Sequence, residues 1–198
     1  MDENLLHDVV AAARKAGADA AEAVFAERQS LSVSVRLGEL EEVEREEARD
    51  LGLRVFIGQR SATVSGSDIS AEARAKLIER AVAMARLAPE DPYASLAPAD
   101  RLARAPYPDL DLVDAYEPTA ETLETQARTA EEHARAVKGV TNSDGGSAAW
   151  SSSRWAMVTS EGFHAAHAAT GHSISASAIA GEGAGMERGG EGRSTRHF

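Results

Sequence analysis

The sequence of 198 residues contains no cysteine. Disulfide bonds, CxxC-type zinc sites, thiolate nucleophiles and iron–sulfur clusters are therefore excluded. Positive charge is scarce, because 21 Lys and Arg stand against 32 Asp and Glu, which gives a formal net charge of −11. An acidic chain repels phosphate backbones, so this balance disfavours nucleic acid as a partner.

The chain also lacks a long hydrophobic run. It begins Met1-Asp-Glu-Asn, which is acidic where a secretory signal is basic, and no apolar core follows. Residues 162–181 carry no Asp, Glu, Lys or Arg, but they include three His and several Gly and Ser. We therefore expect no membrane segment, and we expect a cytoplasmic protein.

Sequence motifs of self-sufficient enzymes are missing as well. None of the six histidines is followed by Glu, so a zincin helix with HExxH is absent. There is no GxSxG nucleophile elbow and no GxxxxGK[ST] phosphate loop. The residues alone therefore predict a chain without a self-sufficient catalytic motif.

All six prolines lie between Pro89 and Pro118. Proline removes a backbone donor and biases the preceding residue away from helix, so this stretch reads as an extended connection. We predict an N-terminal domain over 1–88, a Pro-rich linker over 89–118, and a second domain over 119–198.

Hydrophobic spacing before the linker predicts helices and strands. Leu5 to Ala13 follow one face of a helix, while Val33 to Leu37 and Leu53 to Ile57 alternate as half-buried strands do. Ser70 is a plausible N-cap for a further helix. Strands joined by short turns favour an α+β fold in which helices pack on an antiparallel sheet, with two subdomains joined by the Pro-rich connection.

After the linker, Thr119 is placed to cap a helix that Gly139 ends, and short β segments follow. The sequence from Asn142 to Gly146 (NSDGG) is typical of a hairpin turn. The glycine-rich run 181–192 predicts a flexible loop or strand bends, with a mobile loop near a cleft or a partner as the functional alternative.

Five aromatic or imidazole side chains are candidates for contact with a substrate or partner: His164, His167, His172, Trp150 and Trp155. The alternatives are ordinary sheet histidines and tryptophans that supply core or interface area. In a strand, His164 and His167 face opposite sides, so the spacing does not require a metal site. We assign no catalytic and no metal-binding residue.

An acidic run spans Glu39 to Asp50, with seven acids and two arginines. A solvated strand or hairpin face is one interpretation. A docking surface for a basic partner is the other.

Several short segments, in this order and across nearly the whole chain, resemble the TldD/PmbA family and more closely its PmbA (TldE) branch. They are AGADAAEA from Ala16, VRLGELE from Val35, GLRVFIG from Gly52, SDIS from Ser67, DLDLVD from Asp109, GVTNSDGG from Gly139, TSEGF from Thr159, and HSISAS from His172 with GMER from Gly185. One departure is Gly189-Gly-Glu-Gly, where the family tends to have an acidic and aromatic stretch.

The resemblance implies a two-subunit cytoplasmic zinc metalloprotease that processes or degrades peptides. In the family, the TldD-type subunit carries zinc in an HExxxH motif, and the PmbA-type subunit lacks this motif and shapes the chamber. This chain has no HExxxH, so we expect no cofactor in it and expect zinc in a TldD-like partner.

The same resemblance implies a longer protein, of which this sequence would be the N-terminal part. The expected partners are a TldD-like subunit, peptide substrates, and further copies of the chain through unpaired strand edges at its C-terminal end. An older family name, modulator of DNA gyrase, gives the alternative function of an acidic protein-interaction module.

Overall fold

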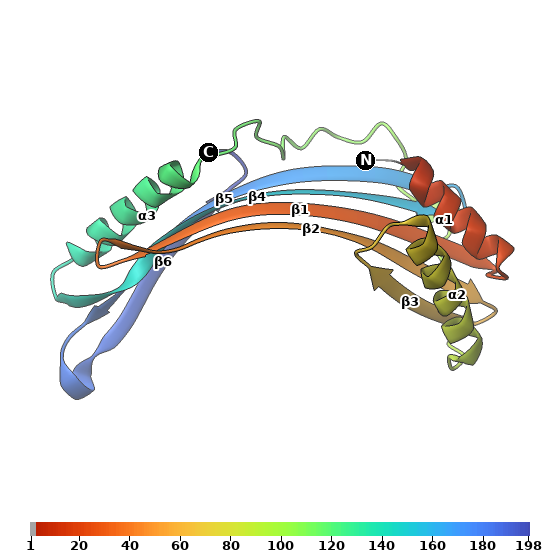
Figure 1. Ribbon diagram of the computed structural model, residues 1–198, viewed down its shortest axis with the longest axis horizontal. Coiled ribbons are helices and arrows are strands. Elements are labelled where there is room, and N and C mark those ends of the chain that lie inside the picture. The colour runs from red at the N-terminus through yellow and green to blue at the C-terminus, as the bar shows by residue number, and fades with distance from the viewer. Residues whose placement is uncertain (1–2) are drawn as a thin grey trace. The chain divides into compact units, whose positions relative to one another are not determined.

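The computed structural model describes residues 3–198 and contains three helices and a six-stranded antiparallel sheet in the order β3-β2-β1-β4-β5-β6 (Figure 1). The helices are α1 (Glu3–Lys15), α2 (Ala71–Leu87) and α3 (Ala120–Arg135). The strands are β1 (Ala20–Arg36), β2 (Glu39–Ile57), β3 (Arg60–Gly66), β4 (Val140–Thr159), β5 (His164–Ala180) and β6 (Glu187–Thr195). The predicted α+β class with helices on an antiparallel sheet is confirmed.

The chain divides into two compact units that share its long strands. Unit 1 comprises the chain up to Glu27, Ala48–Leu110 and Arg154–His167. Unit 2 comprises Arg28–Glu47, Asp111–Ser153 and Ala168–Phe198. Each unit thus takes segments from both sides of the Pro-rich stretch, whereas the division into 1–88, 89–118 and 119–198 follows the order of the sequence.

Unit 1 is built around an apolar core between its part of the sheet and the helices α1 and α2. Alternate residues of the strands point inward, among them Leu53 and Val55 of β2, which are fully buried. The predicted cap of α2 is confirmed, because the Ser70 hydroxyl accepts a hydrogen bond from the backbone N–H of Ala73 at 3.3 Å. Figure 1 shows α2 beside both α1 and β3.

Unit 2 has its own core beneath α3. Leu31, Val33 and Val35 of β1 alternate inward and pack with the helix residues Leu123 and Ala127. The predicted cap of α3 is also confirmed, since the hydroxyl of Thr119 accepts a hydrogen bond from the N–H of Thr122 at 3.2 Å.

The predicted turn over Asn142–Gly146 is wrong. Strand β4 runs through these residues without a break. The glycines serve close packing instead: a Cβ added at Gly146 would lie 2.3 Å from the carbonyl oxygen of Ala127 in α3. A side chain at this position would push the helix off the sheet.

The glycine-rich run is largely ordered as regular structure. A short 3-10 turn at Gly183–Gly185 leads into β6, which pairs along its length with β5. The acidic run lies in β2, where residues 39–50 are all exposed, in agreement with the interpretation as a solvated strand. Within residues 3–198, no helix has the length and apolar character needed to cross a bilayer.

Candidate functional site

The structure places the five predicted contact residues on the hairpin formed by β4 and β5. Thr159 N–H donates to the carbonyl oxygen of Phe163 at 2.9 Å, which closes the hairpin. Counting back along both strands sets Trp155 opposite His167, and their ring centroids are 5.7 Å apart. This pair belongs to unit 1.

Trp155 is 37% exposed, and His167 is half-buried. His164 is exposed and borders a surface groove of about 460 Å³ in unit 1, which is also lined by the segment from Ala99 to Tyr107. These three residues therefore occupy accessible positions, as a contact site requires.

In unit 2, Trp150 and His172 form a second cross-strand pair. The hydroxyl oxygens of Ser147 and Ser175 lie 2.9 Å apart across the two strands, so the antiparallel register sets Trp150 opposite His172. Both side chains are buried, with 5% and 8% exposure. The sequence spacing did not reveal that the two tryptophans and two of the histidines are matched in pairs.

The imidazole of His172 lies against a carboxylate and an aromatic ring. Its Nε2 is 3.4 Å from Oδ2 of Asp114, and its ring meets the ring of Phe198 nearly edge-on at 5.5 Å between centroids. Neither ring nitrogen has a hydrogen-bond partner among residues 3–198, and the same holds for the indole nitrogen of Trp150.

Asp114 is held in place by backbone donors. The N–H of Phe198 donates to Oδ2 at 2.8 Å, and the N–H of Tyr116 donates to Oδ1 at 2.9 Å. These two hydrogen bonds, with smaller contributions from the nearby His172 and His197, hold the pKa of Asp114 below its ordinary value of 3.8. The carboxylate therefore stays ionised beside the imidazole.

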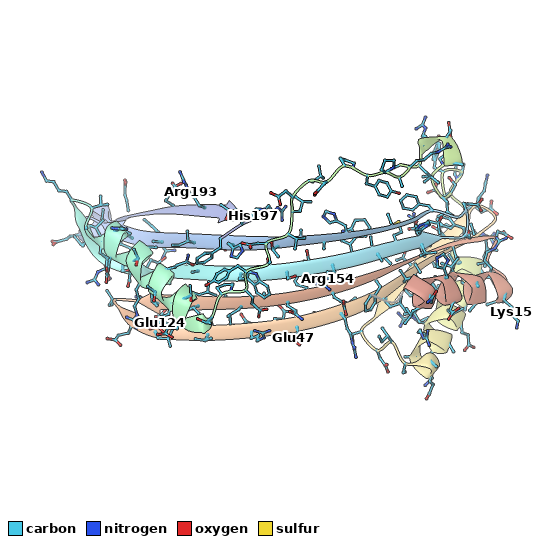
Figure 2. All side chains as sticks on the ribbon, turned by 90° about the horizontal axis from the view of Figure 1, so that it is seen from above. Lys15, Glu47, Glu124, Arg154, Arg193 and His197 are labelled. Atoms are coloured by element: carbon cyan, nitrogen blue, oxygen red, sulfur yellow. The ribbon has the colours of Figure 1, made fainter. Side chains whose placement is uncertain are left out.

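A second histidine and carboxylate pair lies next to the first. His197, labelled in Figure 2, has its Nε2 3.0 Å from the carbonyl oxygen of Asp111 and 3.3 Å from Oδ2 of the same residue. The hydrogen bond to the carbonyl oxygen, followed by the charges of Asp111 and Asp114, raises the pKa of His197 above its ordinary value of 6.5.

Thr170 of β5 joins the two segments that carry these pairs. Its backbone N–H donates to the carbonyl oxygen of Leu112 at 2.9 Å, and its hydroxyl oxygen accepts from the N–H of Asp114 at 2.8 Å. The same hydroxyl lies 2.9 Å from the carbonyl oxygen of Arg196, whose guanidinium donates to the carbonyl of Thr170 at 3.2 Å. We call residues 111–116 and 196–198, joined in this way on β5, the clasp.

The clasp places the imidazole of His197 beside the carboxylate of Asp111, and its Asp114 lies against the imidazole of His172 on β5. A group of three or more His, Asp or Glu side chains suited to hold a metal ion does not occur anywhere in residues 3–198. The described residues therefore offer no set of side chains that could ligate a zinc ion.

Sequence reasoning missed a buried carboxylate on α3. Glu131 is 1% exposed, and its two oxygens accept hydrogen bonds from the N–H of Leu37 at 2.6 Å, from the N–H of Gly38 at 2.8 Å, and from the hydroxyl of Ser143. Burial would raise the pKa of Glu131, but these three hydrogen bonds outweigh it and leave the pKa below its ordinary value of 4.5. Glu131 lies four residues after Ala127, on the stripe of α3 that faces the sheet. This spacing was the sequence signal that could have identified Glu131 as buried.

Unit 2 also carries an apolar groove between α3 and the strands β5 and β6. Its volume is about 560 Å³. Small and apolar side chains dominate its lining, which includes Ala134, Val137, Ile174, Ala176 and Gly190.

Two domain models of one family match the chain in sequence order. The model described as PmbA/TldA metallopeptidase domain 1 matches residues 21–85, and the model described as PmbA/TldA metallopeptidase central domain matches residues 113–198. Together the two matches cover most of the chain, in agreement with the resemblance drawn from the short segments.

Two curated relatives point to the same family as the domain models. Metalloprotease PmbA of Escherichia coli O157:H7 is 34% identical over 171 residues, which is 86% of this chain and 38% of that protein. The metalloprotease PmbA homolog of Haemophilus influenzae is 37% identical over 136 residues, which is 68% of this chain and 30% of that protein. The matched part of the chain thus covers 38% and 30% of the length of these two relatives.

Solved structures show the same fold at lower identity. A protein from Bacteroides thetaiotaomicron, whose given name refers to modulation of DNA gyrase, superposes with a TM-score of 0.91 at 20% identity, over 100% of this chain and 46% of that chain. TldE from Thermococcus kodakarensis superposes with a TM-score of 0.79 at 17% identity, over 97% of this chain and 43% of that chain. On the combined evidence, this chain belongs to the TldD/PmbA metallopeptidase family and corresponds to the N-terminal portion of a PmbA (TldE)-type protein.

Proposed function

We propose that this chain is the non-catalytic N-terminal part of a PmbA/TldE-like subunit in a cytoplasmic zinc metalloprotease complex that processes or degrades peptides. In this proposal a TldD-like subunit holds the zinc and activates water. The present chain forms part of the chamber and supplies contact surface, with His164, His167 and Trp155 as candidate contacts to peptide or partner, whereas Trp150 and His172 are buried.

The observation that carries this proposal is the match to PmbA proteins over 171 residues in a sequence without HExxxH. The geometry is compatible with it. His164, His167 and Trp155 offer accessible aromatic and imidazole surface, which suits contact with a peptide.

The test measures zinc content and peptidase activity with and without a TldD-like subunit. We expect the purified chain to bind zinc below stoichiometry and to hydrolyse no unfolded peptide. We expect the PmbA-type protein that contains it to co-purify with the TldD-like subunit, and the complex to lose activity with a chelator. A stoichiometric zinc site with three ligands from this chain, or chelator-resistant peptidase activity of this chain, would overturn the proposal.

A second candidate is an acidic protein-interaction module that acts on DNA gyrase. The exposed run from Glu39 to Asp50 supports it, because all twelve of its residues are exposed. Arg45 pairs with Glu47 at 3.4 Å and with Glu117 at 3.2 Å, which leaves the acids in excess. Charge pairing across such a surface would weaken with salt.

Binding of the chain to immobilised DNA gyrase, measured from low to high salt, tests this second candidate. We expect binding that weakens steeply with salt and is lost in a variant with Glu42→Lys, Glu44→Lys and Glu46→Lys. A matched variant with three lysines on α3, at Glu121, Glu124 and Glu132, controls for net charge. Absent or salt-insensitive binding would remove this candidate and leave the protease proposal untouched.

A further inference from the structure

Strand β6 lies at the edge of the sheet. It pairs with β5 from His172 opposite Thr195 to Ala180 opposite Glu187, and it has no other strand partner within residues 3–198. All nine of its residues are exposed. Such an edge presents a row of unpaired N–H and C=O groups that can accept another strand.

Two features that often protect an edge strand, a proline and a bulge, are absent from β6, whose register with β5 has no break. Four side chains are charged, and one of them is already engaged: Arg188 pairs with Asp144 at 3.2 Å. Glu187 and Arg193 make no ion pair within the described chain, and Figure 2 labels Arg193 on this outer strand.

We propose that the β6 edge binds the β6 edge of a second copy of this chain, antiparallel, with a two-fold axis at Gly190. In this arrangement Glu187 of each copy lies opposite Arg193 of the other. The two symmetric contacts give two ion pairs that the single chain leaves unmade. The surface is therefore a homodimer interface built by strand addition.

Symmetry restricts the register. Opposed residues in an antiparallel pair alternate between hydrogen-bonded and non-hydrogen-bonded types. If the two-fold axis lay between two successive residues, it would make two neighbouring residue pairs equivalent, although one must be hydrogen-bonded and the other not. The axis must therefore lie where a residue faces its own copy. An axis at Gly189 sets Glu187 against Glu191, and an axis at Glu191 sets that residue against itself. An axis at Gly190 sets Glu187 against Arg193.

One further axis also matches opposite charges. An axis at Gly192 sets Glu191 against Arg193, but it sets Arg188 against Arg196 of the other copy. Like charges directly opposite one another are destabilising, so the axis at Gly190 is favoured. The two registers differ in which glutamate faces Arg193, and this difference can be tested by charge exchange.

The experiment measures the dimer dissociation constant of the 198-residue chain by sedimentation equilibrium. We expect a dimer at roughly 100 µM protein and weakening by about tenfold or more in R193E or E187R, because each change replaces two attractive contacts by two repulsive ones. The double variant E187R/R193E restores opposite charges and should regain most of the affinity. K138E carries the same charge change as R193E outside β6 and should dimerise like the unmodified chain.

A cross-linking measurement checks the register independently of affinity. Because the chain has no cysteine, mixing E187C with R193C should give a mixed disulfide dimer under mild oxidation, in preference to dimers of either variant with itself. Circular dichroism of each variant confirms that it folds.

A monomeric chain at 100 µM would overturn the proposal, and so would failure of the double variant to recover. Recovery by E191R/R193E in place of E187R/R193E would overturn the Gly190 register. None of these results bears on zinc binding or peptidase activity, so they test the dimer proposal independently of the proposed function.

Discussion

Glu131 on α3 and Gly38 in the turn between β1 and β2 are 93 residues apart in the sequence, yet Oε2 of Glu131 accepts a hydrogen bond from the N–H of Gly38 at 2.8 Å. The other carboxylate oxygen accepts from the N–H of Leu37. Both turn residues have positive φ, 53° and 79°, as a two-residue hairpin turn of type I′ requires. The helix thus binds the turn through a single buried carboxylate.

Replacing Glu131 by Ala should destabilise unit 2 strongly. Two backbone N–H groups and the Ser143 hydroxyl would lose their acceptor, and unsatisfied buried donors are costly. We expect the free energy of unfolding to fall by about 2–4 kcal/mol in urea denaturation. Glu132→Ala, at an exposed neighbouring position, is the control and should change stability little. Equal effects of the two substitutions would contradict this role.

The same carboxylate should make the chain sensitive to acid. The pKa of Glu131 is lower in the folded chain than its ordinary value of 4.5. A depressed pKa contributes stability that is present above the unfolded value and is lost as the pH falls through the folded value. The free energy of unfolding should therefore decline below about pH 4.5, and Glu131→Gln should flatten this decline. A variant with the unchanged acid slope would contradict the assignment.

Leu37 should be replaceable with a gain in stability. Its φ of 53° is left-handed, which is unfavourable for a leucine, and its side chain is 51% exposed. Asn tolerates this conformation, so Leu37→Asn should raise the free energy of unfolding by about 0.5–1 kcal/mol. Leu40→Asn, which removes a similarly exposed leucine (46%) from the adjacent strand, is the control. A loss of stability in Leu37→Asn would refute the argument.

The sequence was informative where structure is local. The hydroxyls of Ser70 and Thr119 cap the helices that they were predicted to cap. Alternation at Val33 and Val35 marked a real strand face. These features depend on spacing within a few residues, which a single sequence displays.

The sequence alone did not reveal contacts between segments that are far apart along the chain. The glycines at 145 and 146 read as a turn because turns favour glycine, but here Gly145 permits close approach of the Val35 backbone of β1, and Gly146 permits α3 to approach the strand. Likewise, the pairing of Trp150 with His172 depends on the hairpin register, and the pairing of His172 with Asp114 depends on where a long connection returns to β5. No local rule specifies either.

Substituting Gly146 tests this packing directly. A Cβ at this position would lie 2.3 Å from the backbone oxygen of Ala127 and 3.1 Å from the Cβ of Glu131. Because backbone cannot yield as a flexible side chain does, Gly146→Ala should cost about 3 kcal/mol of unfolding free energy. Gly185→Ala, where an added Cβ meets nothing within 4 Å, should be nearly neutral. A neutral Gly146→Ala would mean that α3 is less closely packed than described.

The clasp should loosen as the pH rises. The pKa of His197 is raised in the folded chain because the imidazolium donates to the carbonyl of Asp111 and lies near the carboxylates of Asp111 and Asp114. A raised pKa contributes stability that is complete below the ordinary value of 6.5 and is lost as the pH rises through the folded value.

The difference in unfolding free energy between the unmodified chain and His197→Gln should therefore be larger near pH 5.5, below the ordinary pKa of 6.5, than near pH 8.5. His7→Gln, on the exposed face of α1, removes a histidine outside the clasp and should show no such difference. Proton chemical shifts of the His197 ring, followed through the same range, give its pKa directly. A pKa at or below 6.5, or a pH-independent difference between the two proteins, would show that the imidazolium does not hold residues 196–198 against residues 111–116.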